Sequence, residues 1–296
     1  KHFLDISFLA GGFGSLGLQS NSFDVVVVNG LINYLHPYQV LADAVQLAKK
    51  YIEEGALGQL LDFRGTYLQD WSADPNSPLS WRFQKNICGS GALGDIGTHI
   101  VDMLRFLVGE FASVNARTAT YITERPTQSG LADSLGTIKS SENVPKKPVD
   151  VDDHCCFMVQ CQNGVFGTIE ATRNAWGRNN YITFEIHGTE GSLFFNYERR
   201  DELQVCFAKD GDDRRGFRTV YTGPAHPYGN QLWPIPALGI GYTETKMIEV
   251  YEFLKGIADG TPTEPNFRDG YITELISDAI LESARTHTWT DVKTIE

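Results

Sequence analysis

The sequence has no apolar run long enough to cross a lipid bilayer. A membrane-spanning helix needs about 20 consecutive apolar residues, whereas the longest apolar runs here, such as residues 25–28, have the length of a strand. The start of the chain also lacks a basic region followed by an apolar region, the pattern of a secretory signal. Only five cysteines occur in 296 residues, which fits a reducing compartment. The sequence therefore predicts a cytoplasmic protein without a membrane partner.

A basic surface is also missing. The chain carries 25 Lys and Arg residues against 37 Asp and Glu residues, a formal net charge of -12. Nucleic acid needs a basic face to neutralise its phosphates. The short basic runs at 146–147, 199–200 and 214–215 are isolated, and we interpret them as solvated loop charges. The sequence predicts no nucleic-acid partner.

Cysteines at metal-binding spacing are absent as well. Cys155 and Cys156 are adjacent, so on a strand they point to opposite faces and cannot easily hold one ion. Together with Cys161 they lie in an apolar run and are expected to be buried thiols. His99 lies four residues after Asp95, a spacing that can ligate zinc, but no third ligand is visible nearby. We predict no metal site.

The chain has little room for a dinucleotide-binding unit. Residues 12–17 match the pattern G-x-G-x-x-G and follow an apolar run. That motif needs a strand, a full helix and a second strand with an acid about 20 residues on. Only six residues separate Gly17 from Asp24, which leaves no space for the helix. We expect residues 1–43 to be at most a remnant of such a domain. The first residue is Lys1, so we also expect the chain to start inside a longer protein.

From residue 44 onward, the sequence shows regular periodicity. Helical spacing covers 45–54 and ends at Gly55. Alternation predicts a strand over 59–71, with one side formed by Leu61, Phe63, Gly65, Tyr67 and Gln69. Further strands are expected at 154–160, 165–172, 181–187, 192–197, 203–208 and 218–221, and helices at 95–107, 243–259 and 269–287. Short turns between consecutive strands favour antiparallel pairing. This predicts an α+β domain over 44–296, with helices on one face of a large, open, mostly antiparallel sheet, whose other face is expected to form a homo-oligomer.

The segment 94–102 carries the strongest chemical pattern. Asp95, His99 and Asp102 fall at positions i, i+4 and i+7, which share one face of a regular helix. Asp95 is a good N-cap for that helix. Carboxylates beside an imidazole favour its protonated form, and histidine is a natural acid or base for an alcohol–ketone pair. A capping Asp, a satisfied buried His and a surface Asp explain the same spacing, so both interpretations stay open.

Other polar residues lie near this segment in sequence or at strand ends. Trp81 and Arg82 together can stack on a planar ligand and bind an anion, and Lys85 follows them. A Trp that anchors the loop and a solvated Arg are the alternative. Arg173, Trp176 and Arg178 come just after a predicted strand and are candidates for the same pocket. Residues 152–154 (Asp-Asp-His) are expected mainly to be a strand entry with a solvated tip.

These residues resemble the Gfo/Idh/MocA dehydrogenases, named for glucose–fructose oxidoreductase, inositol dehydrogenase and a rhizopine-catabolism protein. The resemblance covers roughly residues 45–290. It rests on segments 48–50, 55–58, 81–82, 91–102, 151–153, 163–164 and 188–192, in this order. It implies a Rossmann domain for NAD or NADP, followed by the α+β domain. It also implies that Asp95 and His99 lie at the reacting hydroxyl, with Trp81 and Arg82 near the nicotinamide. The strand over 63–71 is similar to the branch that acts on sugar glycosides and anhydrosugars.

The chain departs from the family pattern in two ways. The Glu-Lys-Pro motif, whose Lys is a catalytic partner in the family, does not occur here. Only about 40 residues precede the match, whereas a Rossmann domain needs about 120.

The sequence patterns and the family resemblance lead to three hypotheses. The first is an NAD(P)-dependent oxidoreductase acting on a ring hydroxyl of a sugar, anhydrosugar or inositol. In it, His99 is the base, Asp95 orients it, and Asp102, Arg173 and Lys85 bind substrate. We expect this chain to be inactive alone. The second is a non-catalytic sugar-binding or oligomerising module. The third is a metal-dependent hydrolase using Asp95, His99 and Asp152.

Overall fold

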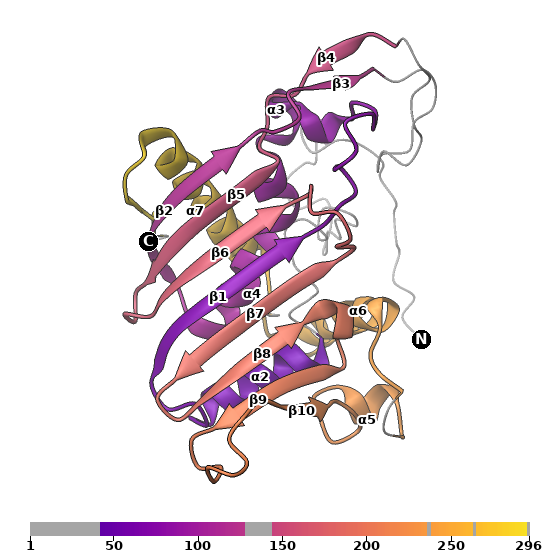
Figure 1. The fold of residues 1–296 in the computed structure, drawn as a ribbon. Coiled ribbons are helices and arrows are strands. Elements are labelled where there is room, and N and C mark those ends of the chain that lie inside the picture. The colour runs from indigo at the N-terminus through magenta and orange to yellow at the C-terminus, as the bar shows by residue number, and fades with distance from the viewer. Residues whose placement is uncertain (1–41, 128–143, 236–237, 263–264, 295–296) are drawn as a thin grey trace, which may run out of the picture.

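A single large sheet organises the part of the chain that the structure describes. The computed structural model describes residues 42–127, 144–235, 238–262 and 265–294. Its nine-stranded sheet has the order β10-β9-β8-β7-β1-β6-β5-β2-β11 (Figure 1). The long strands are β1 (Leu60–Leu68), β2 (Phe111–Ala119), β5 (His154–Cys161), β6 (Phe166–Thr172), β7 (Tyr181–Gly188), β8 (Gly191–Asn196) and β9 (Glu202–Phe207). The edge strands are β10 (Arg218–Tyr221) and β11 (Thr290–Asp291).

Neighbouring strands of this sheet run antiparallel, except at its centre. There β1 pairs with β6 in parallel register, from Asp62 opposite Phe166 to Leu68 opposite Thr172. The carboxyl ends of β1 and β6 therefore meet at the same edge of the sheet, and the segments that follow them leave side by side. The predicted α+β class with a large, mostly antiparallel sheet is confirmed. The predicted remnant at residues 1–43 lies almost wholly outside the described residues.

Three helices cover one face of the sheet. In Figure 1, α2 (Asp43–Glu53), α4 (Thr98–Val108) and α7 (Phe267–Thr286) lie behind the strands. The apolar stripe predicted for α4 is buried: Ile100, Met103, Leu104 and Leu107 are at most 2% exposed. Gly65 on β1 allows this contact, because a Cβ there would lie 2.4 Å from Cδ1 of Leu104. This contact holds α4 close against β1.

Shorter elements surround this core. A short sheet of β3 (Glu124–Pro126) and β4 (Lys146–Pro148) lies beyond the carboxyl ends of β1 and β6, near α3 (Lys85–Cys88) (Figure 1). The helices α5 (Gly229–Leu232) and α6 (Tyr242–Asp259) follow β10. No helix among the described residues is long and apolar enough to span a membrane.

Several local predictions need correction. Leu61 was expected to lie beside Phe63 and Tyr67, yet it is 48% exposed, because the pairing of β1 with β7 shifts register between Leu60 and Asp62. The strand β2 was not predicted at all. Cys155 and Cys161 are buried as predicted, whereas Cys156, which points to the opposite face from Cys155, is exposed. The register shift and the unpredicted strand both depend on pairing partners that lie far away in the sequence.

Candidate functional site

The predicted Asp95–His99 pair sits where the carboxyl ends of β1 and β6 meet the start of α4. Asp95 was expected to cap a regular helix, but it lies inside a π-helical turn, Leu93–Gly97, that leads into α4 without a break. Such wider turns are rare and occur often at functional sites. Here the turn places the carboxylate of Asp95 against two arginines.

Asp95 is held by one cation on each oxygen. Its Oδ2 atom lies 3.3 Å from Nη1 of Arg173, which donates a hydrogen bond to it. Its Oδ1 atom lies 3.5 Å from Nε of Arg82. The side chain of Asp95 keeps 16% exposure, whereas Arg82 keeps 11% and Arg173 none. Because a carboxylate has about four acceptor sites, Asp95 can still accept a hydrogen bond from a ligand.

His99 lies next to Tyr67, the last buried residue of β1. The two rings meet edge to face, with centroids 5.9 Å apart. The Nδ1 atom of His99 is buried and has no hydrogen-bond partner in the described part of the chain. Burial, with a smaller contribution from Lys246 on α6, lowers the pKa of His99 to about 4, against the opposing influence of Asp95. Asp95 does favour the protonated form, as predicted, but burial outweighs it, so this imidazole is neutral at physiological pH.

A polar network continues from Tyr67. Its hydroxyl donates to Oδ1 of Asn180 at 2.5 Å, and Nε2 of Gln69 donates to both groups, at 3.1 and 3.2 Å. Burial and the nearby Asp95 raise the pKa of Tyr67, which keeps its hydroxyl a donor. These roles of Tyr67, Gln69 and Asn180 were not predicted. The available signal was the alternation of the 59–71 strand, which places Tyr67 and Gln69 on one side.

Asp152 fastens the π-helical turn to the sheet. Its Oδ1 accepts from the backbone N–H of Gly91 at 2.6 Å, and its Oδ2 accepts from that of Leu93 at 2.8 Å. The prediction of a solvated tip at residues 152–154 is wrong for Asp152 and Asp153, which are 7% and 0% exposed. The metal-dependent hydrolase also lacks a ligand set here, because no group of three His, Cys, Asp or Glu side chains in the described part of the chain is arranged to hold a metal ion.

Arg173 is placed at the site, but not where a substrate can reach it. Its side chain is fully buried, and its guanidinium lies 5.2 Å from the ring centroids of both Trp71 and Phe83. Besides Asp95 it approaches the backbone oxygen of Asp152, 3.4 Å from Nη2. In this conformation Arg173 does not present a donor to solvent, so the predicted direct contact with substrate is not supported by its burial.

Asp102 does not share a face with Asp95 in the folded chain. Its Oδ1 accepts from Nη1 of Arg105 at 2.8 Å, and the hydroxyl of Thr273 on α7 lies 3.4 Å away. Arg105 also pairs with Asp269 of α7. The carboxylate of Asp102 is 4% exposed and joins α4 to α7. The predicted spacing assumed a regular helix, and the π-helical turn before Thr98 breaks that assumption.

Trp81 and Lys85 lie at the rim of the site. Trp81 is 39% exposed, and the guanidinium of Arg82 stacks over its ring at 4.4 Å. Lys85 has an exposed side chain, while its backbone N–H donates to Asp150. The ring of Trp81, with Arg82 stacked on it, thus provides an exposed aromatic surface at this rim. The motif at 12–17 lies outside the described residues.

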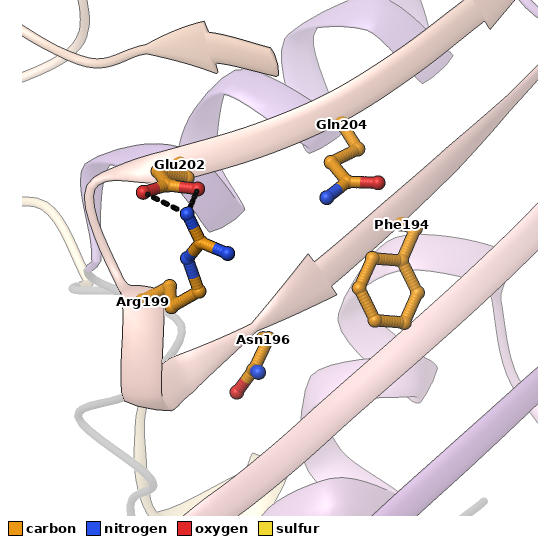
Figure 2. Close-up of a pocket in the computed structure, with 5 residues that line it drawn as sticks. All are labelled: Phe194, Asn196, Arg199, Glu202 and Gln204. Carbon is orange, nitrogen blue, oxygen red and sulfur yellow. Dashed lines mark hydrogen bonds and ion pairs between the residues drawn. The ribbon is translucent and has the colours of Figure 1, made fainter. Parts of the chain in front are cut away.

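A shallow pocket elsewhere on the sheet is a separate feature. It is lined by Phe194, Asn196, Arg199, Glu202 and Gln204, from β8, β9 and the turn between them (Figure 2). The guanidinium of Arg199 is paired with Glu202 at 3.0 Å. Neither Asp95 nor His99 lines this pocket, so it is not the candidate reaction site.

Comparison with known proteins gives consistent matches. Residues 45–194 match the family model of the GFO/IDH/MocA C-terminal domain. Levoglucosan dehydrogenase of Pseudarthrobacter phenanthrenivorans is 70% identical over 252 residues, which are 85% of this chain and 64% of that protein. A structure of levoglucosan dehydrogenase in complex with NADH and levoglucosan is 65% identical, with a TM-score of 0.80, over 87% of this chain and 65% of that one.

More distant structures share the fold. An oxidoreductase domain protein from Kribbella flavida is 37% identical, with a TM-score of 0.79, over 87% of this chain and 66% of that one. An inositol dehydrogenase homologue from Azotobacter vinelandii is 15% identical with a TM-score of 0.67, a likeness of fold alone. The chain spans somewhat less than two thirds of the length of the relatives it matches.

Proposed function

Because the chain belongs to the Gfo/Idh/MocA family, we propose that it is the substrate-binding part of a nicotinamide-dependent dehydrogenase acting on a ring hydroxyl of a sugar. An anhydrosugar such as levoglucosan is the first candidate, since a relative 70% identical to this chain is a levoglucosan dehydrogenase. One observation carries the proposal. A neutral histidine, His99, lies next to Asp95, a carboxylate held by two arginines, at the end of the parallel strand pair.

In the oxidation direction, His99 accepts the proton of the reacting hydroxyl. A base must be unprotonated before it can act, and the lowered pKa of about 4 meets this condition across the neutral range. Asp95 favours the imidazolium that forms, because an anion beside an imidazole stabilises its protonated state. With Nδ1 buried, we assign proton transfer to Nε2. The buried surroundings exclude water from Nδ1 and fix the ring against Tyr67.

The cofactor of this reaction is NAD, because relatives were crystallised with NADH. When bound, it supplies the hydride acceptor for the carbon that carries the hydroxyl. Trp81 and Arg82 of this chain would face its nicotinamide end. Only six residues separate Gly17 from Asp24, too few for the helix of a dinucleotide-binding unit, so we expect the 296-residue chain to bind sugar but not to turn it over alone. A second copy would cover the open face of the sheet.

Calorimetry on the full 296-residue chain tests the proposal. Levoglucosan, other sugars and inositols are titrated with and without NADH or NADPH. We expect measurable binding of one sugar class, loss of that binding in His99→Gln, and retention in His187→Gln, a histidine on the open sheet face. Absence of binding by every sugar, or equal losses in the two variants, refutes the proposed site.

The same titrations separate the alternative of a non-catalytic sugar-binding module. The observation that favours this alternative is the polar network of Tyr67, Gln69 and Asn180, whose groups can bind hydroxyls without a nicotinamide cofactor. If the chain is the substrate-binding part of a dehydrogenase, its affinity for the sugar should change when the nicotinamide cofactor is present. Sugar affinity that is identical with and without NADH and NADPH, together with no hydride transfer, favours the module.

A further inference from the structure

Two arginines of this chain are completely buried, and they differ in what they contact. Arg125 and Arg173 each have no exposed surface. They lie over the ring of Phe83, with the guanidinium carbons 4.2 and 5.2 Å from the ring centroid. Burial of a cation costs several kcal/mol unless it is well paired. The hydrogen-bond and ion-pair partners of each arginine therefore indicate what its buried guanidinium does.

Arg125 has only backbone oxygens as hydrogen-bond partners. Its Nη1 donates to the carbonyl of Asp74 at 2.8 Å and approaches that of Ser77 at 3.5 Å, and its Nη2 donates to the carbonyl of Ser72 at 2.5 Å. These bonds fix the loop between β1 and the 3-10 turn Trp81–Phe83. Burial is the largest influence on Arg125 and lowers its pKa to about 10. These contacts indicate that Arg125 stabilises the fold of this loop.

Arg173 instead reaches the candidate base system. Its Nη1 donates to Oδ2 of Asp95 at 3.3 Å, and Asp95 is more exposed than the arginine behind it. The Nε atom of Arg173 is buried with no partner in the described part of the chain. The guanidinium thus sits behind the carboxylate, on the side away from solvent. Nε of Arg125 is likewise buried without a partner in the described part of the chain, so the contact with Asp95 is what distinguishes Arg173.

The backbone around Arg173 is fixed as well. Its N–H donates to the carbonyl of Asp153 at 3.3 Å, and its carbonyl accepts from both the N–H and the hydroxyl of Ser72, at 3.2 and 3.1 Å. The ring of Trp71 lies over the guanidinium at 5.2 Å. The side chain therefore cannot swing out to a ligand without breaking a packed aromatic contact.

We propose that Arg173 is a positioning residue, which holds Asp95 as an ionised, correctly oriented acceptor beside His99, rather than a residue that binds substrate. The link between Arg173 and the reaction rests on the proposed function. The effect of Arg173 on Asp95 and His99 can be measured without a substrate. Arg82 holds the other oxygen of Asp95 from the more exposed side. Arg173 supplies the part of the clamp that water cannot screen.

The test compares Arg173→Met with Arg125→Met in the full chain. Both remove a buried cation from the face of Phe83, but only one removes a contact to Asp95. The first readout is the imidazole resonance of His99 by NMR, assigned with His99→Gln. We expect Arg173→Met to move this resonance and its titration, because Asp95 acts on the imidazole through space. In folded Arg125→Met protein, the His99 resonance and its titration should stay unchanged.

The second readout is sugar affinity. Loss of a hydrogen bond to a charged group corresponds to about a tenfold loss of affinity or more, so we expect Arg173→Met to weaken sugar binding by about that factor. Arg173→Lys keeps the charge and should recover part of the affinity.

A double-mutant cycle covers the case in which Arg173→Met does not fold. Arg173→Lys is then combined with Asp95→Asn. If Arg173 acts through Asp95, the lysine variant has no further effect on the His99 resonance or on binding in the Asp95→Asn background.

The outcomes separate this role from the proposed function. An unmoved His99 resonance in a folded Arg173 variant, equal movement in Arg125→Met, or additive effects in the cycle overturns the positioning role. A chain that binds no sugar, but shows the Arg173-specific change at His99, refutes the proposed substrate class and supports the positioning role.

Discussion

At the scale of single residues, the neutral state of His99 links the site to stability. An unfolded histidine titrates near 6.5, while burial holds the pKa of His99 at about 4 in the folded chain. Between these values the unfolded chain binds more protons, so this contribution is fully present above about pH 6.5 and is lost as the pH falls toward 4. Burial of His99 therefore makes the folded chain less stable at acid pH than at neutral pH.

We expect His99→Gln to flatten the acid side of the stability profile. The shift of His99 corresponds to about 3 kcal/mol of unfolding free energy lost between pH 6.5 and pH 4. Urea unfolding at a series of pH values in wild type and His99→Gln measures this as the difference between the two curves. Parallel curves would mean that the imidazole is already hydrated in the folded chain.

Gly91 is a second residue on which the site depends. A Cβ at this position would lie 1.8 Å from the backbone oxygen of Asp152. We expect Gly91→Ala to push the π-helical turn away from the sheet and to cost about 3 kcal/mol or more in urea unfolding, as severe overpacking does. Gly216→Ala is the matched control, because no atom lies within 4 Å of its added Cβ. Similar stability of the two variants would contradict the close approach.

At the scale of elements, periodicity predicted most of the long strands and helices but not the geometry of the site. The α4 stripe and the strands β5 to β10 follow from local patterns. In each of these elements one side faces the core, so apolar residues recur there at the period of a helix or a strand. The π-helical turn does not, because Asp152 of a distant segment holds Gly91 and Leu93. Asp95 and His99 were predicted from their spacing and lie together. Asp102 and Arg173 were assigned to the substrate, and their burial depends on α7, Trp71 and Phe83, which no local pattern reveals.

The contact between α4 and α7 depends on one arginine. Arg105 is 9% exposed and pairs with Asp102, Glu110 and Asp269. Burial raises the pKa of Asp102 to about 7, even though Arg105 lowers it. We expect Arg105→Met to cost about 3 kcal/mol, the usual penalty for leaving a buried charge without its partner.

The loss in Arg105→Met should also depend on pH. Without Arg105 the folded chain favours protonated Asp102 still more, so its ionisation opposes folding and the loss is larger at pH 8 than at pH 5. Urea unfolding at both values measures it. Arg285→Met removes an exposed pair with Glu282 and should produce no measurable change. A loss that is the same at both pH values would show that removal of Arg105 does not change the protonation of Asp102 between them.

At the scale of the whole molecule, the sheet has one face that the described helices leave open. Alternate residues of its central strands point to this face and carry charges of both signs. His187 lies between Asp62 and Glu185, at 2.8 and 2.9 Å, and Arg64 pairs with Asp62. Apolar side chains accompany them, with Met158 38% and Phe166 39% exposed. A surface with both signs of charge can complement itself across a two-fold axis, which supports a homo-oligomer.

We expect Met158→Glu to weaken this assembly, because a two-fold axis brings the new charge into the interface from both copies. The molar mass from light scattering over a dilution series should fall in this variant at concentrations where wild type is assembled. Leu254→Glu is the control: Leu254 is 53% exposed and lies on α6, outside the sheet. If Leu254→Glu lowers the mass while Met158→Glu does not, the interface lies on α6 instead. A wild-type chain that is monomeric at every concentration would show that the open face needs no second copy, and its exposed apolar residues would then require another explanation.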